Sequence, residues 1–224
     1  MADKDSFRQG GNKILLAVFL LFSSISTDAQ TSDSKKKAIN STAEIVSVIL
    51  TSSYPEIKPK KIHYKTFDSD TNFFKARFSN ARYLTFQKMR HLIYVNPKVF
   101  SLGAPKKGVQ AIVAHELAHV WYYTKKNRFE LLGLASLLSK GFTRKFERKA
   151  DLEAISRGYG EGLIEYREWL YKNIPQEKVP DKRKNYFSPE EIKLIIKILK
   201  TRPKMIRVWK KKVPLNIEQI RNTI

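Results

Sequence analysis

The spacing of apolar and polar positions divides the chain into a short strand-rich region and a long helical region. Between residues 61 and 97, aromatic and β-branched residues alternate or cluster in short segments with polar breaks between them, which predicts strands. These segments are KIHYKTF, FFKARFS, ARYLTFQ and HLIYVNP. After Val109 the apolar positions follow a helical period. This order predicts an α+β fold with a short N-terminal antiparallel sheet followed by a mainly helical half.

Glycine and proline positions set the expected helix boundaries. Residues 43–50 predict a short apolar helix ending near Tyr54, and the turn-like SLGAPKKG precedes an apolar helix over 107–123. Gly158 and Gly160 end a charged helix, and GLIEYREWLYKNI predicts the next one. Residues 175–184 are expected to form a loop.

The last long helix has a clear start signal. Ser188 stands before Pro189 at the first helical position and Glu191 three residues on, which is a capping box. A stripe of apolar residues then predicts the buried face of this helix, namely Ile192, Ile195, Ile196 and Leu199.

The first 29 residues have the pattern of a secretory signal peptide. A mildly basic start leads into the apolar run ILLAVFLLF, Ile14 to Phe22, whose nine residues at about 1.5 Å each cannot cross a bilayer core of about 30 Å. Thr27 and Ala29 fit the small-residue cleavage rule, so we expect a mature chain that begins at Gln30 and is periplasmic or secreted. The alternatives are an uncleaved anchor and a buried core helix.

The remaining chain has the length of one domain. The polar stretch TSDSKKKAINST predicts a flexible segment over residues 30–42, and residues 43–224 are long enough to form a single domain with a proper core. The chain has no cysteine, so it has neither a lipoprotein anchor nor disulfide bonds.

The chain is strongly basic. Its 43 Lys and Arg against 21 Asp and Glu give a formal net charge of +22, and the excess is dispersed in short runs. Dispersed charge is typical of a solvated surface, but at this magnitude it also attracts polyanions. For an exported chain, these are anionic membrane lipids or envelope polymers before nucleic acid.

The stretch AIVAHELAHVWYY contains the candidate chemistry. His115 and His119 are four residues apart, so a helix places both imidazoles on one face toward one ion. Glu116, beside the first histidine, is positioned to hold a water on the metal. This H-E-x-x-H pattern is the signature of zinc peptidases.

The third ligand has to be a carboxylate. No histidine follows His119, and Lys125 stands where one class of such enzymes has a third histidine. Glu147 lies on the next charged helix, and Asp151 one turn later could accept the other ring N–H of a metal-bound histidine. The alternative assigns Glu147 to a solvated charged face. His63 and His91 lack a ligand-spaced partner and are interpreted as strand residues.

VAHELAHV followed by FERKADLEAISRGYG resembles the gluzincin metallopeptidases of the HtpX and prenyl-protease branch, whose pattern is H-E-x-x-H and then E-x-x-x-D. The resemblance covers residues 90–160. It implies a zincin-like fold, zinc bound by His115, His119 and Glu147, Glu116 as the catalytic residue and Asp151 as the supporting aspartate. In this family the strand equivalent to residues 91–95 edges the cleft. The long membrane-spanning helices of that branch are missing, which predicts a small soluble relative.

These features predict a zinc metallopeptidase that hydrolyses peptides or proteins, with Glu116 as the general base. The residues Arg157, Tyr159 and Tyr166 are open candidates for stabilising the oxyanion. The connector FELLGLASLLSKGF, residues 129–142, is either part of the core or an exposed lid. The rival functions are a non-catalytic, cationic envelope-binding protein with a structural zinc site and a nucleic-acid-binding protein.

Overall fold

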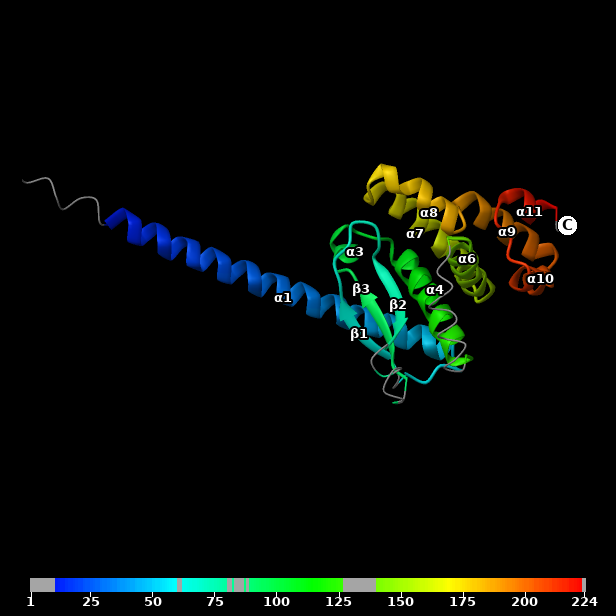
Figure 1. Ribbon diagram of the computed structural model, residues 1–224, viewed down its shortest axis with the longest axis horizontal. Helices are drawn as coiled ribbons and strands as arrows, with labels where there is room; N and C mark the ends of the chain where they lie inside the picture. The colour runs from blue at the N-terminus through cyan, green and yellow to red at the C-terminus, as the bar shows by residue number, and fades with distance from the viewer. Residues whose placement is uncertain are drawn as a thin grey trace, which may run out of the picture.

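A computed structural model of the chain describes residues 11–59, 62–79, 82, 87, 89–126 and 140–222, with side chains from residue 32 onward apart from 140 and 141. The fold is α+β, with one small sheet next to a larger assembly of helices (Figure 1). The helical C-terminal half follows the sheet, as the sequence predicted.

The first helix is much longer than the sequence predicted. Helix α1 spans Gly11–Ser53, and its first half projects away from the rest of the molecule (Figure 1). Ala38, Thr42, Val46 and Ile49 are buried at helical spacing, and the Thr42 hydroxyl donates to the Ala38 carbonyl oxygen at 2.7 Å. Residues 30–42, predicted to form a flexible segment, are helical here, and among their described side chains Ala38 and Thr42 are buried and those of residues 32–37 are exposed.

The sheet has three strands in the order β1-β3-β2, with β1 over Ile62–Thr66, β2 over Phe74–Phe78 and β3 over His91–Val95. Strand β3 pairs with β2 antiparallel and with β1 parallel, so the sheet is mixed and not purely antiparallel as predicted. Ile93 and Val95 of β3 are completely buried. This apolar strand takes the central position and leaves β1 and β2 outside it. The predicted strand ARYLTFQ lies almost entirely outside the described residues.

The helical half begins directly after the sheet. Its elements are α3 (Lys98–Ser101), α4 (Lys106–Thr124), α6 (Lys140–Ser156), α7 (Gly160–Asn173), η2 (Gln176–Lys178), α8 (Val179–Asn185), α9 (Pro189–Thr201), α10 (Met205–Lys211) and α11 (Ile217–Arg221). Almost all of the connector at 129–142 lies outside the described residues. Within the described part of the chain, no helix is both long enough and apolar enough to span a membrane.

Helices α4 and α7 cross at very short distance. A Cβ atom on Gly162 would lie 2.5 Å from the Lys107 carbonyl oxygen and 2.8 Å from the Ala111 Cβ, so this position admits only glycine without movement of the backbone. A Cβ on Gly108 would meet the backbone of Tyr166 at 3.1 Å. The close crossing fixes α4, which carries the two candidate histidines, against the helical half.

The start of α9 agrees with the sequence prediction, and the segment before it does not. The Ser188 capping box is confirmed, because its side chain accepts from the Glu191 backbone N–H and the Glu191 side chain accepts from the Ser188 backbone N–H. The predicted loop at 175–184 is wrong, since η2 and α8 occupy it. Proline fits the first turn of α8, where no intrahelical N–H bond is needed. Of the predicted α9 stripe, Ile192 and Ile195 are fully buried, and Ile196 and Leu199 are partly buried.

Candidate metal centre and cleft

Helix α4 is enclosed on nearly all sides. Its residues from Val109 to Val120 are buried except for Gln110, and small alanines on either side of His115 allow neighbouring elements to approach closely. Consequently the side chains of His115 and His119 are only 1% and 4% exposed. Packing therefore fixes both imidazoles before any ligand binds.

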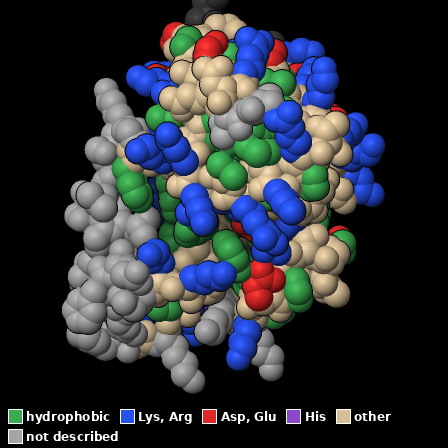
Figure 2. Space-filling model, turned by 90° about the vertical axis from the view of Figure 1, so that its right-hand side faces the viewer, with side chains coloured by type: hydrophobic (Ala, Val, Ile, Leu, Met, Phe, Trp, Pro, Cys, Tyr) green, Lys and Arg blue, Asp and Glu red, His purple; other side chains and the backbone are tan. Residues whose placement is uncertain are grey.

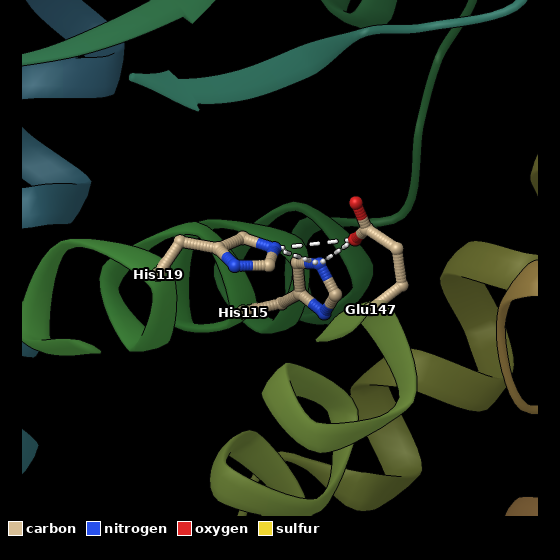
Figure 3. Close-up of side chains that lie close together, drawn as sticks. All are labelled: His115, His119 and Glu147. Atoms are coloured by element: carbon tan, nitrogen blue, oxygen red, sulfur yellow. Dashed lines mark hydrogen bonds and ion pairs between the residues drawn. The ribbon is translucent and has the colours of Figure 1, made fainter. Parts of the chain in front are cut away.

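Helix α6 brings Glu147 to the two histidines. The Glu147 Oε2 atom lies 3.2 Å from the Nε2 atom of His115 and 3.1 Å from the Nε2 atom of His119, and the two Nε2 atoms are 3.2 Å apart. The three side chains converge from α4 and α6 (Figure 3). Together they form a group that could hold a metal ion.

The spacing of these atoms fits a small divalent cation. A tetrahedral ion with ligand bonds of about 2.0 to 2.1 Å has donor atoms about 3.3 Å apart. The three measured separations of 3.1 to 3.2 Å agree with that value. Two imidazole nitrogens and one carboxylate oxygen also form the donor set of many catalytic zinc sites. The sequence prediction that these three residues come together agrees with this geometry.

Asp151 holds His115 from the side opposite the candidate ion. Its Oδ1 atom lies 2.8 Å from His115 Nδ1 and 3.0 Å from Arg167 Nη2, and its Oδ2 atom accepts the Phe187 backbone N–H at 3.0 Å. Burial opposes the charged carboxylate, yet Arg167 and His115 hold the pKa of Asp151 below its usual value. An ionised Asp151 favours a proton on Nδ1, which leaves Nε2 directed at His119 and Glu147.

The same partners affect the imidazole of His115. Burial disfavours its charged form, but Asp151 and then Glu147 outweigh this and raise the pKa of His115 to about 10 when no ion is bound. Two carboxylates therefore attract positive charge to the position between the histidines. A metal ion has to displace the proton that this environment favours.

Glu116 lies next to the group without being part of it. Burial raises the pKa of its carboxyl, and the carboxylate accepts a hydrogen bond from the backbone N–H of Ala76 in β2. A carboxylate with a raised pKa is suited to take up and release a proton near neutral pH.

A cleft of about 420 Å³ opens onto these side chains. Strand β2 forms one wall through residues 74–78, and Phe142 and Phe146 of α6 contribute to the lining, together with Glu116, His119 and Glu147. The gluzincin resemblance implied that residues 91–95 edge the cleft. That expectation is wrong, because β3 is paired on both sides and β2 is the strand that lines the cleft.

The backbone of β2 has donors and acceptors directed at the cleft side. The Asn96 N–H donates to the Phe73 carbonyl oxygen and the Ser79 N–H to the Arg90 carbonyl oxygen, so bonding to β3 continues through Lys75 and Arg77. In an antiparallel pair the intervening residues point their N–H and C=O groups the other way. The groups of Phe74, Ala76 and Phe78 therefore lie along the outer edge, where Ala76 meets Glu116.

Of the open oxyanion candidates, two are engaged elsewhere. The Arg157 side chain bonds Glu56, Glu153 and the Ser53 carbonyl oxygen, and the Tyr159 hydroxyl bonds Ser53 at 2.9 Å. Tyr166 is buried and lines a small recess that Glu116 also lines. The strand histidines His63 and His91 lie in β1 and β3, outside the three-residue group.

The site includes three side chains that sequence reasoning missed. Arg167 pairs with Asp151, Tyr186 lines the cleft, and Lys182 lines the adjoining recess. Burial raises the pKa of the Tyr186 hydroxyl well above its usual value, so this phenol remains a hydrogen-bond donor. No spacing rule links these residues to the H-E-x-x-H helix, and only the docking of α7 and α8 brings them to it.

Comparisons with protein-family models, curated proteins and solved structures find no match to this chain. The resemblance to gluzincins therefore rests on the motif residues alone.

Proposed function

We propose that the protein is a zinc-dependent metalloendopeptidase. The observation that carries the proposal is the group of His115, His119 and Glu147, with Asp151 behind it and Glu116 lining the cleft beside it. Three protein ligands beside open space are typical of a catalytic zinc site, whereas structural sites are usually closed by four protein ligands. Among the described residues, the group has three members.

Each residue has a distinct role in this mechanism. Zinc held by the two histidines and Glu147 would act as a Lewis acid on a water molecule and on the scissile carbonyl. Glu116 accepts a proton from the attacking water and delivers it to the leaving amine, a role favoured by its raised pKa. Tyr186 carries a protonated hydroxyl in the same cleft and can donate to the developing oxyanion.

The substrate is proposed to bind as an additional strand beside β2. The edge of β2 that faces the cleft presents the outward backbone groups of Phe74 and the carbonyl oxygen of Ala76, to which an extended peptide can bond. The aromatic side chains in the cleft supply apolar contacts for the substrate side chains.

We further propose that the enzyme acts in the cell envelope or outside the cell. Cleavage after Ala29 would fall inside α1. The described buried side chains of α1 begin only at Ala38, so removal of residues 1–29 takes away none of them. Export is thus compatible with an intact core.

Metal analysis of the purified mature protein, followed by digestion of a peptide library, tests the activity. Zinc at one equivalent together with hydrolysis that Glu116→Gln abolishes is the expected result. Bound zinc without hydrolysis of any peptide would instead favour the rival function, a cationic envelope-binding protein with a structural zinc site.

The charge distribution is the observation that favours this rival. The face formed by α9, α10 and α11 carries many Lys and Arg side chains and few acidic ones (Figure 2). Residues 192–217 contain no Asp or Glu. Such a surface attracts anionic lipids or polymers, and it can serve an enzyme as well as a binding protein.

A further inference from the structure

Lys182 is a half-buried cation without a carboxylate partner among the described residues. It projects from α8 toward the sheet, and its Nζ atom donates to the Asn72 side-chain oxygen at 2.8 Å. Burial, reinforced by Arg167, outweighs the attraction of Glu147 and Glu116 and lowers the pKa of Lys182 to about 8. Asn72 is neutral, so this hydrogen bond does not neutralise the ammonium charge.

The buried arginines among the described residues are neutralised. Arg167 pairs with Asp151 at 3.0 Å, and Arg148 pairs with Glu191 at 2.9 Å. An ammonium group has three N–H donors, and removing it from water is costly unless an anion compensates. Lys182 therefore differs from both arginines in lacking the anion that its position favours.

The surroundings of Lys182 connect it to the candidate active site. Lys182 and Arg167 line a recess of about 20 Å³ that is also lined by Asn72, Glu116 and Tyr186. The last three residues line the main cleft too. A recess of this size holds about one water-sized group, so oxygen atoms of a ligand fit there but a complete side chain does not.

The carboxylates near the recess are already engaged. Glu147 bonds the two histidines, Glu116 accepts the Ala76 backbone N–H, and Asp151 bonds Arg167. Lys75 of β2 adds a further positive charge close to Lys182. A ligand that reaches the recess from the cleft thus meets an ammonium group whose hydrogen bond in the described structure goes to a neutral amide.

We propose that Lys182, oriented by Asn72, binds a carboxylate of the peptide substrate next to the scissile bond. This inference rests on the proposed peptidase function. The carboxylate has two possible sources, the side chain of an Asp or Glu residue near the cleaved bond and the free C-terminus of the peptide. Both present the same two oxygen atoms to the ammonium group, which favours a charge-assisted hydrogen bond.

Binding measurements test this without requiring hydrolysis. Zinc-loaded Glu116→Gln protein is titrated calorimetrically with capped hexapeptides of Ala and Ser that carry Glu or Gln at each position in turn. A second pair compares a free C-terminus with an amidated one. We expect one Glu position, or the free C-terminus, to bind about tenfold more tightly than its neutral counterpart. Equal binding of all charged and neutral pairs would overturn the proposal.

Variants then assign the preference to this side chain. In the Glu116→Gln background, Lys182→Gln should remove the preference, and Lys182→Glu should make the corresponding Lys peptide the tighter ligand. Lys184→Gln, an exposed lysine of the same helix, is the matched control and should keep the preference. Should Lys182→Gln fail to fold, Asn72→Ala tests the same contact from the other side. A preference that persists in folded Lys182→Gln contradicts the proposal.

The two proposals can fail separately. If the parent protein hydrolyses no peptide but Lys182 still discriminates carboxylate from amide, the peptidase function is wrong and the carboxylate site stands. If library digestion shows cleavage with no preference for Asp, Glu or a free C-terminus, the peptidase stands and the carboxylate site is wrong.

Discussion

The two sides of His115 differ in how fully their polar atoms are bonded. On the inner side, Asp151 is completely buried and makes three contacts of 2.8 to 3.0 Å, to His115, Arg167 and the Phe187 backbone. On the outer side, a cleft of about 420 Å³ is lined by Glu116 and by the outer edge of β2. The Asp151 carboxylate on the inner side is bonded without a ligand, and the outer side has donors and acceptors that a ligand can use.

This difference separates the residues that hold His115 in place from the residues that would take part in the reaction. Changes on the inner side should reduce metal affinity and stability together, because they leave buried groups without partners. Changes on the outer side should reduce turnover while the fold and the metal remain. Glu147 lies where the two sides meet, since it bonds both histidines and also lines the cleft.

The largest effect is expected for Glu147→Ala. The substitution leaves two protein ligands, so zinc affinity should fall by more than the factor of about 100 that is typical of outer hydrogen-bond partners. Titration with zinc under chelator competition measures the loss. Glu161→Ala, at an exposed glutamate of α7, is the matched control. Parental affinity in Glu147→Ala would mean that the third ligand lies elsewhere and would remove the main support for the gluzincin resemblance.

Glu116→Gln should lower turnover by about a hundredfold or more, the usual scale for the loss of a general base. Glutamine keeps the size of the side chain and the acceptor for the Ala76 backbone N–H, so zinc content and thermal unfolding should remain near the parental values. Turnover, metal content and unfolding are measured on the same preparation. Undiminished turnover at full zinc occupancy would refute the proposed mechanism.

Asp151→Asn should weaken zinc binding by about 10- to 100-fold, because His115 loses the partner that orients its ring. It also leaves the buried Arg167 without a counter-ion, a change that typically costs about 3 to 5 kcal/mol. Chelator competition and thermal unfolding of the metal-free protein record the two effects. Asp181→Asn, at an exposed aspartate of α8, should change neither. If Asp151→Asn lowers zinc affinity but leaves metal-free stability unchanged, the inner side is less structural than the comparison implies.

The sequence predicted the parts of the site that depend on local spacing. His115 and His119 are four positions apart, as are Glu147 and Asp151, so a helical period aligns each pair. The same helical period places Glu153 on another face of α6, and there it pairs with Arg157 and Lys210. Because Glu153 is buried in those contacts, an exposed glutamate is the better control for Glu147.

Features that depend on tertiary contacts could not be read from the sequence. Asp151 meets Arg167 across 16 positions and the Phe187 N–H across 36, and no local pattern encodes these distances. The parallel pairing of β1 with β3 was likewise missed, because alternation of side chains gives the faces of a strand but not its neighbours. The burial of Ala38 and Thr42 in a helix was also not predicted, because the polar composition of residues 30–42 concealed it.

The smallest effect is expected for Ser188→Ala, which tests how far the inner side extends. Ser188 caps α9 directly after Phe187, whose backbone N–H donates to Asp151. Loss of an N-cap side chain typically costs about 1 kcal/mol, which lowers the melting temperature of a domain of this size by about 2 to 4 °C. Zinc affinity should stay within about twofold, because Glu191 still holds the Ser188 backbone N–H and so keeps Phe187 in position.

Ser47→Ala on the exposed face of α1 provides the control and should be neutral or slightly stabilising. Thermal unfolding of the metal-free form of both variants measures stability, and comparison with the zinc-loaded form shows any change in zinc affinity. A large loss of zinc affinity in Ser188→Ala would mean that the N-cap of α9 also helps to hold His115 in place.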